Sequence, residues 1–130
     1  MTPFGERVRQ LRADHGVSLR RMAADLEVSP AYISALEHGH RSRPNWALVQ
    51  RMITYFGLIW DDADELMDLA RISHPRVVID TSGLSPDATR LANRLAISIH
   101  RLDADQLAQL NGLLESGEGA DGGEPGEGGT

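Results

Sequence analysis

Few side chains in this sequence are spaced for catalysis or for metal binding. His38 and His40 flank Gly39, but no third ligand follows nearby, so we interpret them as loop residues rather than as a metal site. The acidic run between residues 61 and 68 is interpreted as a solvated helix start, where carboxylates suit the helix dipole. No serine, histidine or aspartate lies in a strained turn or a glycine-rich loop of the kind that exposes a nucleophile. We therefore expect no enzyme, no metal and no cofactor.

The cations are the remaining candidates for chemistry, and all thirteen are arginines. Residues 1–60 contain eight arginines and five acidic residues, a local charge of +3, whereas residues 61–130 contain five arginines and fourteen acidic residues, a local charge of −9. Phosphate groups are bound by local cationic surface and not by the average over the chain. The first half is therefore the candidate for contact with nucleic acid, despite the net charge of −6.

The composition narrows the class of protein further. A hydrophobic fraction of 41% and a charged fraction of 25% are ordinary for a globular protein, and no apolar run reaches the length of a membrane span. The first apolar residues are interrupted by charged ones, which does not suit a signal peptide. Without cysteine, disulfides and cysteine-ligated zinc are excluded. We expect a cytoplasmic protein that does not contact a membrane.

Apolar residues recur at helical spacing through the first 73 residues. The pattern, together with capping residues and glycine or proline stops, predicts helices at residues 4–15, 19–26, 30–38, 46–56 and 61–73. Small Ala23 lies where the second and third of these helices would cross, and Val28 lies where their turn must fill the core. Two short helices joined by a tight turn are the arrangement that presents one helix to a DNA major groove.

Three short stretches in this region match a known pattern in register: Ser18–Ala23, Val28–Ser34 and Leu36–Gly39. On these residues the sequence resembles the Cro/C1-type, or XRE, helix-turn-helix regulators, which include the lambdoid phage repressors. Pro44 also falls where the family usually has a proline. The resemblance covers residues 4 to about 70, and it implies a five-helix, lambda-repressor-like DNA-binding domain within residues 1–73.

The resemblance also assigns roles to individual positions. It implies that the first residues of the third helix contact base edges: Pro30, Ala31, Tyr32, Ser34 and Ala35. Ser29 would cap that helix and donate to a phosphate. Backbone-contacting positions correspond to Arg41, Arg43 and Asn45, and Arg20 is a further candidate for a phosphate contact. Arg12 and Glu37 match a buried ion pair that joins the first helix to the third.

Two positions depart from the family pattern. Leu19 stands where the family usually has glutamine, which grips a phosphate and braces the first base contact, so this interaction is expected to be lost. Glu27 stands in the turn where glycine is usual, and a non-glycine residue at positive φ is strained by roughly 1 kcal/mol. Because of both departures, the DNA specificity of the family can be carried over to this sequence only in part.

The composition changes after residue 75. A β-branched run at residues 77–79 predicts one short strand, and two helices are expected between Pro86 and Ser116. The glycine-rich, acidic residues 117–130 are expected to be a disordered tail. A single domain of this size makes few DNA contacts, so we expect a homodimer formed by residues 76–116. Its interface would contain Val77, Val78, Ile79, Leu91, Leu95 and Ile99.

The sequence thus favours a mainly α protein that binds double-stranded DNA and regulates transcription. The most specific hypothesis is a dimeric repressor on a pseudo-palindromic operator with half-site centres about 10 bp apart. An alternative from another class is a protein-interaction module, such as an antitoxin whose acidic C-terminal half binds a basic partner protein. A ligand sensor is a third possibility, although so short a segment leaves little room for a pocket.

Overall fold

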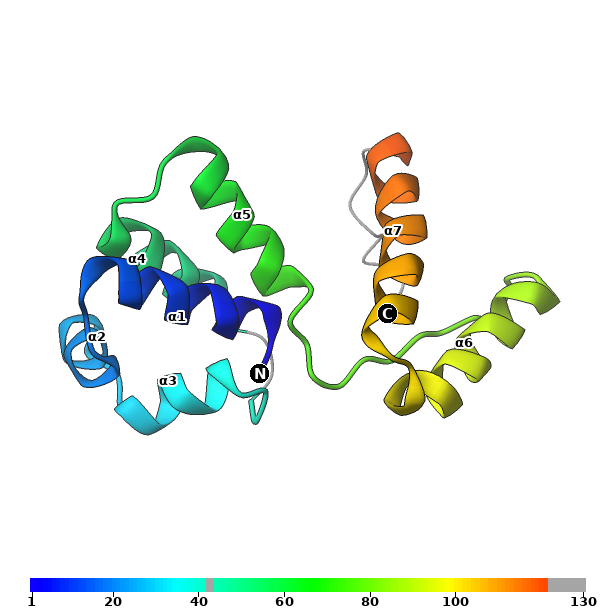
Figure 1. The fold of residues 1–130 in the computed structure, drawn as a ribbon, viewed down its shortest axis with the longest axis horizontal. Coiled ribbons are helices and arrows are strands. Elements are labelled where there is room, and N and C mark those ends of the chain that lie inside the picture. The colour runs from blue at the N-terminus through cyan, green and yellow to red at the C-terminus, as the bar shows by residue number, and fades with distance from the viewer. Residues whose placement is uncertain (42–43, 122–130) are drawn as a thin grey trace. The chain divides into compact units, whose positions relative to one another are not determined.

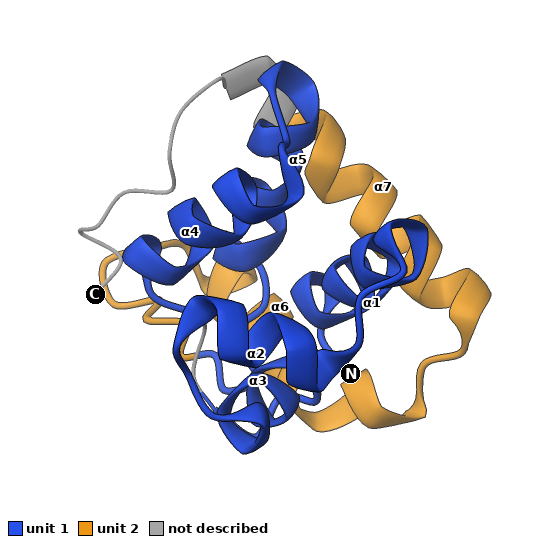
Figure 2. Ribbon diagram, turned by 90° about the vertical axis from the view of Figure 1, so that its left-hand side faces the viewer, with its two compact units in different colours: residues 1–77 blue, residues 78–130 orange. Residues whose placement is uncertain are grey.

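The computed structural model describes residues 1–41 and 44–121 of the 130-residue chain. The chain divides into two compact units, residues 1–77 and residues 78–130 (Figure 2). All regular elements among the described residues are helical, five in the first unit and, in the second, two α-helices joined by a short 3₁₀ turn (Figure 1). The mainly helical architecture expected from the sequence is therefore confirmed. None of the described helices is long and apolar enough to cross a membrane.

The five helices of the first unit pack around α1. They are α1 (Pro3–His15), α2 (Leu19–Leu26), α3 (Pro30–Glu37), α4 (Trp46–Phe56) and α5 (Trp60–Arg71). α1 packs against both α3 and α5, while α2 packs against α3 and α4 against α5. The first helix therefore joins the α2–α3 pair to the α4–α5 pair (Figure 1).

Side-chain caps begin four of these helices. Thr2, Ser18, Ser29 and Asn45 each accept a hydrogen bond from a backbone amide in the first turn of the helix that follows. Such caps satisfy amides that have no partner within the helix, and each contributes about 1 kcal/mol. The helix starts expected after Ser18, Ser29 and Asn45 are confirmed, whereas α1 begins at Pro3, one residue before the expected start.

One apolar core fills the space between the five helices. Every residue in it is at most 7% exposed, and all five helices contribute. The core consists of Phe4, Val8, Leu11, Met22, Ala23, Leu26, Ile33, Leu36, Leu48, Val49, Met52, Phe56, Leu66 and Ala70. Burial of this surface is the main favourable term that holds the helices together.

α1 and α3 approach each other closely at a glycine. A side-chain carbon placed on Gly5 would lie 2.2 Å from the Glu37 carbonyl oxygen and 2.5 Å from its Cα, so no larger residue fits without moving a helix. Next to this point Thr2 N donates a 2.9 Å hydrogen bond to the same carbonyl oxygen. The end of α3 is therefore fixed directly on the start of α1.

The second unit contains α6 (Pro86–Ser98), the 3₁₀ turn η1 (Ile99–Arg101) and α7 (Ala104–Asp121). Ser85 caps α6, and Asp103 with Gln106 forms a capping box at the start of α7, with reciprocal bonds of 2.8 and 3.0 Å. From residue 78 to 117, where side chains are described, no residue is buried. The part of this unit whose side chains are described therefore has no core of its own.

The strand expected at Val77, Val78 and Ile79 is not formed, and this prediction was wrong. The described residues contain no strand, and residues 77–80 have no regular structure. A β-branched run favours extended backbone, but a strand needs a neighbour for its amides and carbonyls, and the described chain provides none. The three side chains are 67%, 85% and 56% exposed.

The last helix is longer than expected. α7 continues past Ser116 to Asp121, so the first five residues of the expected disordered tail are helical. Glycine weakens a helix by about 1 kcal/mol per residue but removes no hydrogen bond, whereas proline does, and the first proline after α7 is Pro125. Residues 122–130, the rest of that tail, lie outside the described residues.

Candidate nucleic-acid interface

The helix α3 packs against the rest of the domain through one side only. Its inward residues Ile33, Leu36 and Glu37 are buried, and the Ser29 hydroxyl accepts a 3.1 Å hydrogen bond from Tyr32 N at its start. Before it, the turn after α2 closes through a 3.0 Å bond from Val28 N to the Ala23 carbonyl. Because helix and turn are both anchored, the opposite side of α3 is presented to solvent in a fixed orientation.

The residues expected to contact bases lie on that outer side. Pro30 and Ala31 are exposed, and Ser34 and Ala35 are half-buried. Tyr32 is also half-buried, and it packs partly against the apolar core. Ala31, Ser34 and Ala35 are spaced as i, i+3 and i+4, so they share one face of the helix. The outer surface of α3 is therefore small, weakly polar and without a charged side chain.

Arg41 lies beside this surface. Its guanidinium carbon is 5.6 Å from the centre of the Tyr32 ring, within the range of a cation–π contact. The contact restrains a long cation beside Tyr32, in the first turn of α3. Arg43, the next expected phosphate-binding residue, lies outside the described residues.

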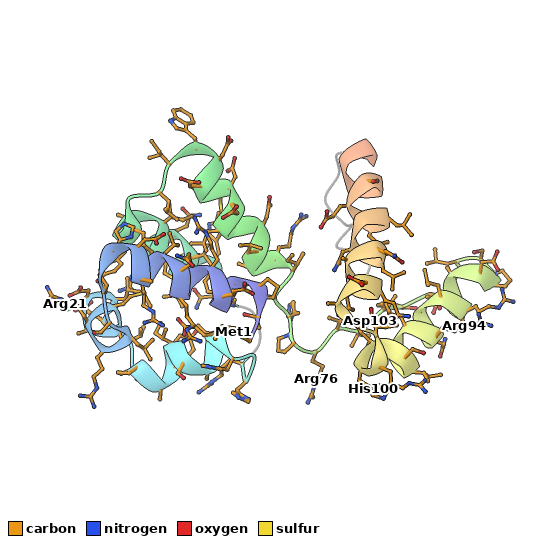
Figure 3. All side chains as sticks on the ribbon, viewed as in Figure 1. Met1, Arg21, Arg76, Arg94, His100 and Asp103 are labelled. Carbon is orange, nitrogen blue, oxygen red and sulfur yellow. The ribbon has the colours of Figure 1, made fainter. Side chains whose placement is uncertain are left out.

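The other residues expected to contact phosphate differ in whether their side chains already form hydrogen bonds or ion pairs within the protein. Asn45 is exposed, but its Oδ1 accepts a 2.8 Å hydrogen bond from Leu48 N, so a phosphate would be met by its amide NH₂. Arg20 is exposed on α2. Its neighbour Arg21 also projects from α2 (Figure 3), but its Nε lies 3.2 Å from an Asp25 carboxylate oxygen.

One comparison with known proteins decides the class of this domain. A protein-family model described as a helix-turn-helix domain matches residues 3–66. These residues are a helix-turn-helix domain. The match includes α1 to α4 and the first half of α5, and it confirms the resemblance stated from the sequence. No curated protein and no solved structure was found to match the chain.

In the helix-turn-helix domain, Arg12 and Glu37 join α1 to α3. Arg12 Nη2 lies 3.3 Å from both carboxylate oxygens of Glu37, and the two side chains are only 15% and 3% exposed. Burial raises the pKa of Glu37 above its ordinary value, although the Arg12 guanidinium acts in the opposite direction. The pair therefore fixes the end of α3, although both charged groups lose their hydration when they are buried.

Two further contacts brace α2 from α4, and sequence analysis did not predict them. Tyr55 OH donates a 2.6 Å hydrogen bond to Asp25 Oδ2, and Arg51 Nη2 donates to the Leu26 carbonyl. The bond from Tyr55, followed by the Arg21 contact, holds the pKa of Asp25 below its usual value. Polar residues on two amphipathic helices give no indication that they will meet across 30 positions, so periodicity alone could not find these contacts.

The residues expected to form a dimer interface are accessible in the single chain. Val77, Val78, Ile79, Leu91 and Ile99 are exposed and Leu95 is half-buried. Val77 belongs to the first unit, whereas the other five belong to the second. Leu91 and Leu95 are i and i+4 on α6, so they share one helix face.

Proposed function

We propose that this protein is a double-stranded DNA-binding regulator of transcription that inserts the start of α3 into a major groove. The observation that carries the proposal is the fixed, outward presentation of Pro30, Ala31 and Ser34 by a helix whose opposite side is buried. In this arrangement the protein binds and orients DNA and performs no chemistry on it. The proposed place of action is the cytoplasm.

The chemistry of α3 limits how sequence would be recognised. Pro30, Ala31 and Ala35 offer no hydrogen bonds, so they favour contact with thymine methyl groups. Ser34 and the Tyr32 hydroxyl are the polar groups at this surface. Direct recognition of bases is therefore sparse, and DNA shape must supply part of the specificity.

Affinity in this proposal comes mainly from phosphates. Arg41 is restrained beside Tyr32, Arg20 is exposed on α2, and Ser29, Asn45 and Arg43 flank the same helix in sequence. Each phosphate neutralised releases counterions, so binding should weaken steeply as salt concentration rises. A repressor that occupies two half-sites about 10 bp apart would double these contacts.

The direct experiment is selection of bound duplexes from a random pool at two salt concentrations, followed by affinity measurements on the selected site. An Ala31→Glu variant, which places a carboxylate on the outer face of α3, should abolish binding. Ala13→Glu, at an exposed position of α1, is the matched control and should bind like the wild type. No enriched sequence, or equal binding by both variants, would contradict the proposal.

The homodimer is a part of the proposal that rests on the second unit. Leu91, Leu95 and Ile99 lie within residues 78–117, none of which is buried, and self-association is one way to remove their apolar surface from water. Light scattering should give a dimer for the full chain. A monomer is expected for Leu91→Asp, and a dimer for Arg94→Asn, which alters an exposed polar position of the same helix.

A second candidate function is binding of a partner protein by the second unit, as in an antitoxin. The same absence of buried residues between positions 78 and 117 supports it, as does the charge of −9 over residues 61–130. A basic partner would complement that charge. A monomeric full chain that forms a stoichiometric complex with a basic protein would favour this function over the homodimer.

A further inference from the structure

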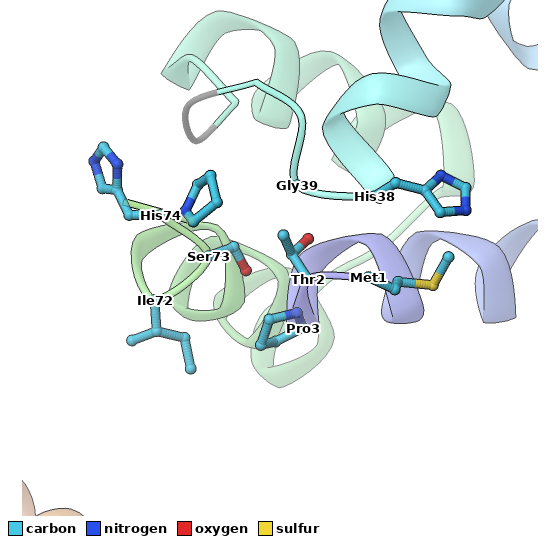
Figure 4. A pocket seen from close by; sticks show the side chains of 9 residues that line it. Met1, Thr2, Pro3, His38, Gly39, Ile72, Ser73 and His74 are labelled. Carbon is cyan, nitrogen blue, oxygen red and sulfur yellow. The ribbon is translucent and has the colours of Figure 1, made fainter. Parts of the chain in front are cut away.

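The chain after α5 returns to the turn that follows α3. Pro75 lies close to Gly39, since a side-chain carbon at Gly39 would be 3.6 Å from Pro75 Cβ and 3.3 Å from the Thr2 methyl group. Just before it, the Ser73 hydroxyl accepts a 2.9 Å hydrogen bond from Phe4 N and is itself buried. Figure 4 shows Thr2, Gly39, Ser73 and His74 around the small pocket at this junction. The segment after Ser73 is therefore anchored beside the α3 turn.

A cavity of about 540 Å³ opens where the two segments meet. Its described lining consists of Gly39, His40, Arg41, His74, Pro75 and Arg76. Two of these side chains are arginines, two are histidines and none is acidic. Arginine offers a planar pair of donors that matches a phosphate, and imidazole offers a donor that becomes cationic as it is protonated. The lining therefore suits an anion with several acceptor oxygens.

This cavity adjoins the proposed DNA-binding face. Arg41 is shared between them, because it lines the cavity and also stacks on Tyr32 of α3. Figure 3 shows Arg76 projecting from the same lower side of the first unit on which α3 lies. A duplex lying along α3 would thus bring a backbone strand toward the cavity.

We propose that His40, Arg41, His74 and Arg76 form a cradle for a DNA backbone phosphate at the edge of the groove that α3 enters. The proposal rests on the proposed function and extends it, since His74 and Arg76 lie beyond the residues of the matched helix-turn-helix family. Arg76 supplies a fixed positive charge from the segment after α5, and Arg41 supplies one from the turn after α3. The segment after α5 thereby becomes part of the DNA-binding surface.

The two histidines of the cradle lie among other charged groups. The titratable and charged groups around them are Arg41 and His38 from the α3 side, Arg76 from the segment after α5, and the Met1 amino group from the N-terminus. His38 is stacked against His40, with ring centres 6.5 Å apart. Imidazole presents a ring N–H to a phosphate oxygen whether or not it is charged, so each histidine adds a hydrogen-bond donor to the cradle.

The test is the affinity of the full-length protein for a short duplex of mixed sequence, measured by fluorescence anisotropy over a series of salt concentrations. Phosphate contacts do not depend on base sequence, so no operator is needed. Arg76→Gln should reduce the slope of log K against log salt by about 1, as loss of one phosphate contact requires. Arg101→Gln, which removes an equal charge from η1, should leave the slope unchanged. His74→Ala, which removes a hydrogen-bond donor from the cradle, should lower the affinity.

The outcomes separate the two proposals. If the wild type binds with a steep salt dependence but Arg76→Gln and Arg101→Gln share its slope, the cradle is refuted and the DNA-binding function stands. If the wild type binds no duplex at any salt concentration, both are refuted. Titration with inorganic phosphate is a third measurement. If phosphate shifts the NMR resonances of His40 and His74 in a saturable way, and Arg76→Gln keeps the wild-type salt slope for DNA, the cavity binds a small phosphate ligand instead.

Discussion

At the scale of single residues, the end of α3 is fixed at Glu37. Its carboxylate pairs with Arg12 of α1, its carbonyl oxygen accepts from Thr2 N, and its backbone touches Gly5. A buried ion pair is costly to form, because both charges lose water. Its effect here is to set one position of α3 relative to α1, and the orientation of the proposed DNA-binding face depends on that position.

The ionisation of Glu37 should appear in the pH dependence of stability. Burial raises its pKa in the folded protein above the unfolded value of 4.5, so the stability contributed by its protonated form is fully present below pH 4.5 and is lost as pH rises through the folded pKa. We expect the free energy of unfolding of the wild type, relative to Glu37→Gln, to fall between pH 4 and pH 7. Urea unfolding of both proteins across this range measures the difference.

The other carboxyl groups are the same in the wild type and in Glu37→Gln. Their contributions to the free energy of unfolding therefore cancel in the difference between the two proteins. Glu65→Gln provides a control, because it removes a carboxylate by the same chemistry from an ion pair with Arg7, in which the Glu65 side chain is 52% exposed. A wild-type advantage over Glu37→Gln that stays level or grows toward pH 7 would show that the attraction of Arg12 outweighs desolvation.

Gly5 provides the second prediction at this scale. An alanine methyl group would overlap the Glu37 carbonyl oxygen, which is backbone and cannot turn away, so α1 and α3 must separate. Overpacking of this kind costs about 1–3 kcal/mol, and we expect Gly5→Ala to lose about 3 kcal/mol in the free energy of unfolding. Gly112→Ala, in α7 with no atom within 4 Å, is the control and should be neutral or slightly stabilising. Similar effects in both variants would contradict the close packing.

At the scale of elements, the turn between α2 and α3 bears a local strain. Glu27 ends α2 in the left-handed conformation, with φ 59° and ψ 41°, as its place in the family pattern led us to expect. A side chain there costs about 1–2 kcal/mol, whereas glycine costs less but is more flexible when unfolded. The turn therefore keeps the geometry of the motif with a residue that does not favour it.

Replacing this residue should stabilise the domain. We expect Glu27→Gly to raise the free energy of unfolding by roughly 0.5–1 kcal/mol, because relief of strain exceeds the added entropy of the unfolded chain. Gly57→Ala is the reciprocal change: Gly57 ends α4 at φ 65° with open space around it, so alanine there should lose a similar amount through strain alone. Thermal unfolding of the two variants and the wild type measures both. A destabilised Glu27→Gly would mean that the Glu27 side chain makes a favourable contact.

The elements themselves were largely predictable, and the contacts between them were not. Apolar spacing and caps such as Ser29 and Asn45 located the five helices, because both are properties of neighbouring residues. The resemblance also supplied Arg12 with Glu37. The close contact at Gly5 joins residues 32 positions apart, and nothing in the local pattern of α1 indicates it. The β-branched run at residues 77–79 misled for the same reason, since a strand depends on a partner elsewhere in the chain.

At the scale of the whole molecule, the two units differ in how they can be stable. The first buries fourteen apolar residues in one core, whereas residues 78–117 bury none. Isolated helices of the length of α6, 13 residues, are marginal in water without packing against another surface. The second unit must therefore gain its stability from whatever covers its apolar side chains, and in the proposed function that is a second copy of the chain.

This dependence leads to a prediction about local stability. If α6 and α7 are held by self-association, their amide hydrogens should exchange with solvent faster as protein concentration is lowered, because dissociation exposes and unfolds them by mass action. Amides of α1 and α5, which pack against each other within one chain, should exchange at rates independent of concentration. Hydrogen exchange followed by mass spectrometry at several concentrations separates the two groups of peptides.

Leu91→Asp should give α6 and α7 the fast exchange of the dilute wild type at every concentration. Exchange in α6 and α7 that is slow at all concentrations would instead mean that the second unit is stable without a partner, and the apolar surface of α6 would then need another explanation than a dimer.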